Sequence, residues 1–231
     1  MGYKKAFFYT TLVNGLHMNV FIDIETLPTE DDETIAVLRE NAKAPGNLKD
    51  PDKIAAAKEA DFQKKWKATA LDGTYGTIAC ICWAIERWPA NELNVNEAGN
   101  EKRLVEAFFS RLKLALDESG PRLPVFIGHN VGFDLKFLWR RAKILGVHIP
   151  FNLHHNAAPW QGKYIDTMYE WCGAKEYIKL KELARVLGVY DGEDIEGSEV
   201  YEMWQSGQHK RVIDHCKMDV ERVRQIYQKF S

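Results

Sequence analysis

Hydrophobic positions in this chain follow two periodicities, which separate expected strands from expected helices. Short runs rich in β-branched and aromatic residues predict strands over residues 20–28, 77–85, 93–95 and 124–127, with a further strand near Tyr164 and Ile165. Apolar residues at helical spacing predict helices over residues 29–43, from 51 to about 66, after 100, over 135–145, after 166, over 180–187, from 198, and over 210–230. Three strands in meander order, then alternating helices and strands, predict an α/β fold: a mixed sheet flanked by helices, with a helical arm inserted at residues 29–72.

Polar residues and glycines mark where several of these helices start and stop. We expect Thr29, with Asp32 three residues later, to cap the first helix. Asp50 followed by Pro51 predicts the start of the second helix, and Asp166 is expected to act as a helix cap rather than as a metal ligand.

Length and composition favour one globular domain with a real core. The chain has 231 residues, of which 45% are hydrophobic and 12% aromatic. No apolar run approaches the roughly 20 residues of a membrane span, so we expect a soluble protein with no membrane partner. Residues 1–17 lack the apolar core and cleavage site of a secretory signal. We predict that residues 1–17 are an N-terminal extension with no part in the chemistry, and that residues 18–231 form a single domain.

The cysteines and histidines give no zinc-ligand spacing. We interpret Cys80, Cys82, Cys172 and Cys216 as small hydrophobic residues in a reducing compartment. The pair His154 and His155 is expected to lie in a solvated loop.

Two carboxylates interrupt the apolar first strand. Asp23 and Glu25 are two positions apart, so they share one face of a strand. Burying two acids is costly unless a cation neutralises them, which suggests a hard divalent metal. A strand at a sheet edge with its acids in water would explain the same pattern.

Two further acids occupy places from which they could join this pair. Asp134 lies near the start of the helix that follows the fourth strand. Asp219 lies at the edge of the buried stripe of the last helix, and His215 precedes it by four residues, on nearly the same face. Sheets of this class place their sites beyond strand ends, so the four carboxylates could converge.

These residues resemble the three motifs of the DEDD (DnaQ-like) 3′-to-5′ exonucleases, which have a ribonuclease H-like fold. The likeness is greatest to the predicted exonucleases similar to family B polymerase proofreading domains. The motifs are Asp23-Ile24-Glu25-Thr26, then His129-Asn130-Val131-Gly132-Phe133-Asp134, then His215-Cys216-Lys217-Met218-Asp219-Val220. Each motif is weak alone, but the three in this order are a strong joint signal.

One position departs from the family pattern. Members carry either tyrosine four residues before the last aspartate or histidine five residues before it. Here His215 stands at the tyrosine distance and Asp214 at the histidine distance. An unperturbed imidazole, with a pKa of about 6.5, suits neutral pH better than a phenol near 10, so we expect His215 to orient or deprotonate the attacking water.

The resemblance implies the remaining chemistry. Two Mg²⁺ or Mn²⁺ ions would be bound by Asp23, as the bridging ligand, and by Glu25, Asp134 and Asp219. Thr26 and Leu27 would meet the terminal nucleotide. Asn130 and Phe133 would line the approaching strand, although a core role suits Phe133 equally.

The expected reaction is removal of nucleoside 5′-monophosphates from the 3′ end of single-stranded DNA. The alternatives are a 3′-to-5′ exoribonuclease and a catalytically silent nucleic-acid-binding module, and a polymerase or replication partner stays open. A net charge of -2 counts mildly against nucleic-acid binding, but four acids balanced by two divalent cations weaken that objection. We expect a cytoplasmic location, as in bacterial, plasmid or phage-type proteins.

Overall fold

A five-stranded mixed sheet forms the centre of the computed structural model, which describes residues 17–120, 122–189, 192 and 195–230. The strands lie in the order β3-β2-β1-β4-β5. Their bounds are β1 His17–Leu27, β2 Thr77–Ile85, β3 Asn91–Asn94, β4 Leu123–Gly128 and β5 Ile165–Asp166. β1 pairs antiparallel with β2 and parallel with β4, so the most apolar strands occupy the middle of the sheet. The expected mixed α/β sheet is confirmed.

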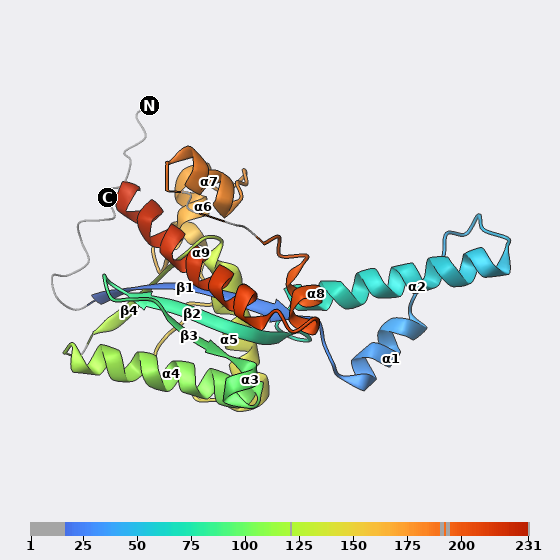
Figure 1. Cartoon of the computed structure of the whole chain (residues 1–231), viewed down its shortest axis with the longest axis horizontal. Helices are drawn as coiled ribbons and strands as arrows, with labels where there is room; N and C mark the ends of the chain where they lie inside the picture. The colour runs from blue at the N-terminus through green and yellow to red at the C-terminus, as the bar shows by residue number, and fades with distance from the viewer. Residues whose placement is uncertain (1–16, 121, 190–191, 193–194, 231) are drawn as a thin grey trace.

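Helices cover both faces of this sheet (Figure 1). Their bounds are α1 Asp32–Glu40, α2 Pro51–Ala68, α3 Val95–Ala98, α4 Glu101–Glu118, α5 Val131–Leu145, α6 Thr167–Cys172, α7 Leu180–Val186, α8 Val200–Gln205 and α9 His209–Phe230, with short 3-10 turns η2 Thr69–Leu71 and η3 Pro159–Gln161. Helices α4 and α5 pack on one face, and α9 crosses the other.

Alternation along β1 divides the core into two parts. Val20, Ile22 and Ile24 pack with residues of α4 and α5. Phe21 and Leu27 pack with residues of α8 and α9. Asp23 and Glu25 have the same parity as this second pair, so β1 presents both acids to the side covered by α9.

The segment between β1 and β2 forms a projecting helical arm (Figure 1). α1 and α2 lie against each other, and the Arg39 guanidinium sits over the ring of the buried Phe62, 4.0 Å from its centroid. At the base of the arm, Trp66 Nε1 donates a hydrogen bond of 2.9 Å to the carbonyl of Thr29. The arm is therefore tied back to the end of β1.

Most expected helix starts are confirmed, but the start of α1 needs a correction. Asp50 caps α2 with Pro51 in its first turn, and Asp166 caps α6. The predicted cap at Thr29 is wrong: Asp31 caps α1 by accepting from Thr34 N at 2.8 Å, and α1 ends at Glu40 rather than near residue 43. Asp31 is the cap because Thr29 is buried and the Thr29 hydroxyl accepts a hydrogen bond from Asp31 N.

Two further boundaries differ from the sequence prediction. β1 begins at His17, which pairs with Leu123, so the expected boundary before Met18 falls inside the strand. Residues 1–16 of the predicted N-terminal extension lie outside the described residues. α5 begins at Val131, four residues earlier than expected, because Asn130 takes a left-handed conformation (φ 61°) and starts the helix there. No helix in the described part of the chain is long and apolar enough to cross a membrane.

Candidate active site

The register of β1 decides where its two acids lie. Asp23 stands opposite Cys82 and Glu25 opposite Cys80 on the antiparallel neighbour β2. On the other side, the pairing of β1 with β4 ends at Phe21. The second half of β1 therefore extends past the end of β4, so both acids lie beyond the last parallel pair of residues.

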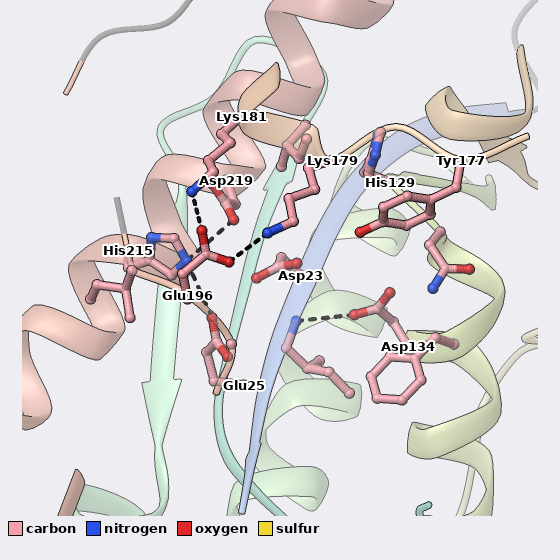
Figure 2. Close-up of a pocket in the computed structure, with 16 residues that line it drawn as sticks. Asp23, Glu25, His129, Asp134, Tyr177, Lys179, Lys181, Glu196, His215 and Asp219 are labelled. Carbon is pink, nitrogen blue, oxygen red and sulfur yellow. Dashed lines mark hydrogen bonds and ion pairs between the residues drawn. The ribbon is translucent and has the colours of Figure 1, made fainter. Parts of the chain in front are cut away.

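Asp134 uses this open edge. It lies in the first turn of α5, is 5% exposed, and its Oδ1 accepts a hydrogen bond of 3.2 Å from Ile24 N (Figure 2). The backbone group that β4 does not pair is thus satisfied by an acidic side chain 110 residues away in sequence. This bond places the Asp134 carboxylate next to the Asp23–Glu25 pair.

The last helix brings the remaining two residues to the same place. His215 Nε2 lies 3.8 Å from Glu25 Oε1 and 3.5 Å from Asp219 Oδ2. The imidazole therefore stands between an acid of β1 and an acid of α9 (Figure 2). Asp214, one residue earlier, is exposed and pairs with Lys210 at 2.7 Å. Asp214 thus points away from the acids, and the imidazole of His215 takes the place beside them.

A buried arginine, Arg222, forms an ion pair with Asp219. Arg222 Nη1 lies 2.7 Å from Asp219 Oδ1, and its side chain is 1% exposed. Because Oδ1 is engaged by Arg222, the Oδ2 atom is the one that faces His215. Sequence reasoning missed Arg222; its position three residues after Asp219 on a buried helix stripe was the available signal.

A pocket of about 290 Å³ opens over these groups (Figure 2). All five predicted catalytic residues line it, together with Asn130 and Phe133. Thr26 and Leu27 are not among the described residues that line it. The Thr26 hydroxyl instead donates to the carbonyl of Ala70 at 2.7 Å, and Leu27 is buried in the core under α9.

Residues of α7 and of the segments that flank it line one side of the pocket, and sequence reasoning did not select them. Tyr177, Lys179, Lys181 and Glu196 line it. Lys179 Nζ lies 2.8 Å from Glu196 Oε2, and Lys181 pairs with the other oxygen of the same carboxylate. Hydrogen bonds from both lysines lower the pKa of Glu196 to about 2. The rim of the pocket therefore carries two lysine side chains and one glutamate that pairs with both of them.

Electrostatics at the bottom of the pocket are unfavourable without a counter-charge. Burial raises the pKa of Asp23 well above its usual value, and repulsion from Asp134, Glu25 and Asp219 adds to this effect. Burial likewise raises the pKa of Glu25, with Asp219 as its main repulsive neighbour, and burial raises that of Asp134. The acids repel one another and favour protonation.

Divalent cations would offset the repulsion between these carboxylates, and the residues present are suitable ligands for such cations. The donors at the bottom of the pocket are carboxylate oxygens, which Mg²⁺ and Mn²⁺ prefer. Four acids supply four negative charges, and two divalent ions would balance them.

A model of the family described as "Predicted 3'-5' exonuclease related to the exonuclease domain of PolB" matches residues 71–231. The chain belongs to this family. The matched range contains the second and third motifs of this 3′-5′ exonuclease, and Asp23 and Glu25 precede it. The structure supplies the missing connection, because Asp134 bonds to β1 beside Asp23.

Solved structures agree on the fold of this DnaQ-like exonuclease. One match is the family B DNA polymerase of the hyperthermophilic archaeon Pyrobaculum calidifontis, with a TM-score of 0.54 at 15% sequence identity. The match covers 92% of this chain and 24% of the polymerase, so the exonuclease spans about a quarter of that protein's length. At this identity the match establishes the ribonuclease H-like fold. No curated protein matches the exonuclease sequence.

Proposed function

We propose that this exonuclease hydrolyses the terminal phosphodiester bond at the 3′ end of single-stranded DNA and releases nucleoside 5′-monophosphates, with two divalent cations bound by Asp23, Glu25, Asp134 and Asp219. One observation carries the proposal: four acids from β1, α5 and α9 line one pocket, where burial and repulsion from the other acids raise the pKa of Asp23 and Glu25. When bound, the cations would activate the attacking water and stabilise the leaving 3′ oxygen.

His215 accepts or directs the proton of the water. Its Nε2 already lies within 4 Å of two of the acids, so a water at the bottom of the pocket would be within reach of the imidazole. The packing of α9 onto the sheet leaves the His215 side chain 7% exposed, which restrains the orientation of its ring. The backbone of α9 thus sets the distance between the base and Asp219.

The rim residues bind the nucleotide strand. Lys179 and Lys181 carry charge for phosphate groups, and Tyr177 and Phe133 offer aromatic faces on which bases stack, each worth about 1 to 3 kcal/mol. In the free protein Glu196 forms ion pairs with both lysines. Incoming phosphates compete with Glu196 for them.

The test is degradation of oligonucleotides labelled at the 5′ end, with Mn²⁺ or Mg²⁺, on single-stranded DNA, duplex DNA and RNA in parallel. We expect a ladder that shortens from the 3′ end, fastest on single-stranded DNA. Faster shortening of RNA would make the chain an exoribonuclease. Intact substrate in every lane would leave a nucleic-acid-binding module.

His215→Ala and Asp214→Asn form a matched pair on the same helix. We expect His215→Ala to lose turnover while retaining DNA binding, because the side chain acts on the water rather than on the strand. Asp214→Asn should keep the wild-type rate, since its side chain is exposed and paired with Lys210. An unaltered rate in His215→Ala would remove His215 from the mechanism.

A further inference from the structure

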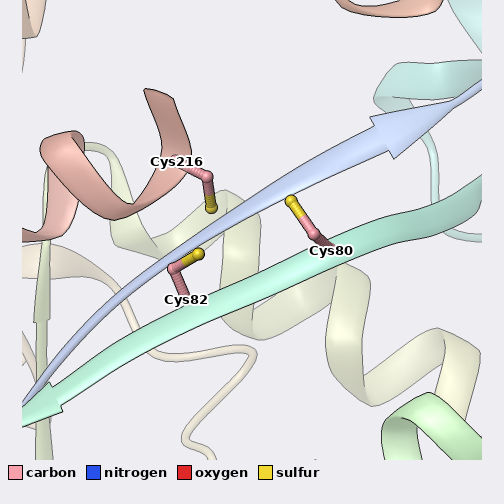
Figure 3. A group of neighbouring side chains, drawn as sticks. All are labelled: Cys80, Cys82 and Cys216. Carbon is pink, nitrogen blue, oxygen red and sulfur yellow. The ribbon is translucent and has the colours of Figure 1, made fainter. Parts of the chain in front are cut away.

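Three cysteine side chains from distant parts of the chain meet beneath α9. The sulfur atoms of Cys80, Cys82 and Cys216 all lie within 4.8 Å of one another, and all three residues are 0% exposed (Figure 3). Two come from β2 and one from α9. Among the described residues, this is the one set of three potential ligand atoms that lie so close together.

The sheet register explains how the cluster forms. Cys80 and Cys82 are two residues apart on β2, so both point to the face that α9 covers. α9 lays Cys216 onto this face, where its Sγ lies 3.4 Å from the carbonyl of Asp23, and Cys82 Sγ lies 3.8 Å from the carbonyl of Ile213. The interpretation of these cysteines as isolated small hydrophobic residues is therefore incomplete, because folding turns them into one donor set.

The donor chemistry differs from that of the catalytic pocket. Thiolates select soft cations such as Zn²⁺, Cu⁺ and Cd²⁺, whereas carboxylates select Mg²⁺ and Mn²⁺. Tetrahedral zinc holds sulfur at about 2.3 Å, which sets neighbouring sulfurs roughly 3.8 Å apart. Because the sulfurs lie within 4.8 Å of one another, a contraction of at most about 1 Å would bring the three thiols to that spacing.

We propose that Cys80, Cys82 and Cys216 form a binding site for one thiophilic cation, separate from the carboxylate site and next to it. Binding replaces three S–H bonds with three metal–sulfur bonds and releases three protons, with no change in oxidation state. The carbonyl oxygen of Asp23 lies 3.4 Å from Cys216 Sγ and is a polar group available for a fourth position. The ion joins β2 to the helix that carries His215.

Cadmium is the probe, because Cd–thiolate bonds absorb in the near ultraviolet whereas Cd–carboxylate bonds do not. The folded protein, reduced with a phosphine and saturated with Mg²⁺, is titrated with Cd²⁺ until the absorption is constant. Native mass spectrometry counts the ions. We expect one equivalent of Cd²⁺ to produce the thiolate band, with a mass gain equal to one cadmium less two protons beyond any Mg²⁺ bound, because a divalent ion replaces two charge-carrying protons.

Cys82→Ala and Cys216→Ala test the cluster, and Cys172→Ala is the matched control because Cys172 lies apart from it on α6 and is only half-buried. We expect Cys172→Ala to behave as wild type. Each cluster variant should bind Cd²⁺ at least tenfold more weakly and lose most of the band, with circular dichroism confirming its fold. If one fails to fold, Cys80→Ala replaces it.

A wild-type protein without the band, or a folded Cys82→Ala variant that keeps it, would overturn the proposal. The readout is separate from nuclease activity, since it reports metal–sulfur bonds alone. Failure here would leave the proposed exonuclease reaction untouched, and failure of the degradation assay would leave this site untouched.

Discussion

Replacing Asp23 by asparagine should stabilise the metal-free protein while abolishing its response to metal. Burial and three acidic neighbours raise the pKa of Asp23 in the folded state. A group whose pKa is raised by folding adds stability below its unfolded value, near 4, and loses that contribution as pH rises through the folded value. The metal-free wild type should therefore lose stability as pH increases, and Asp23→Asn should lose less.

The spacing of the acids gives the size of the effect. Asp23 and Glu25 are two strand residues apart, or about 7 Å. At an effective dielectric constant of about 20, two charges at that distance repel by about 2 kcal/mol. Removing one charge should raise the free energy of unfolding by about that amount at pH 8, which for a domain of this size is roughly 4 to 8 °C in melting temperature.

Calorimetry in EDTA at pH 5 and pH 8 measures this difference, with a repeat in Mn²⁺ at pH 8. Wild type should gain about 2.7 kcal/mol at 100 times the dissociation constant of the metal, and Asp23→Asn should gain little. Asp117→Asn is the matched control, because Asp117 is exposed and forms an ion pair with the exposed Lys113, so its effect should be small. If Asp23→Asn melts below wild type in EDTA at pH 8, the electrostatic reasoning is wrong.

Three further variants test the rim and the support of the pocket. Lys179→Ala with Lys181→Ala should weaken binding of a single-stranded oligonucleotide that carries 3′ phosphorothioates and should lower the salt slope by roughly 1 to 2, which anisotropy titrations at several salt concentrations would measure. Glu196→Gln should tighten the same binding, because it removes the anion that competes for both lysines; equal or weaker affinity would refute that competition. Arg222→Met should cost about 3 to 5 kcal/mol in urea denaturation, because it removes the buried cation that lies 2.7 Å from the partly buried Asp219, and an unchanged midpoint would contradict this.

Local pattern was sufficient for most of the elements, whereas the predicted catalytic acids needed the order of three motifs along the chain, because each motif is weak alone. The β-branched run of β1 with two acids of the same parity, the cap and proline at Asp50 and Pro51, and the acid four residues after His215 are all short-range signals. Each depends on the periodicity of a strand or a helix, so each can be read from neighbouring positions. The order of these elements along the chain predicts the mixed sheet. The order of the motifs, including the one that contains Asp134, predicts the family.

Helix starts inside loops were harder to predict. Thr29 and Asp31 are both good caps, and burial of the threonine against the arm decided between them. Asn130 started α5 early by adopting a left-handed backbone conformation, which the sequence permits but does not require. The Thr26 hydroxyl donates to the carbonyl of Ala70, and its contact with the terminal nucleotide stays a prediction.

What only the tertiary structure decided is which distant side chains share a space. The sequence by itself determined the sheet with flanking helices, the acids of β1 and the spacing of His215 and Asp219. Only the register of β2 on β1 and the docking of α9 placed Cys216 next to Cys80 and Cys82. Likewise, only the tertiary packing brought Glu196 to Lys179. The physical reason is range: periodicity determines the face on which a residue lies, whereas its partner across a sheet or under a helix depends on how whole surfaces pack together.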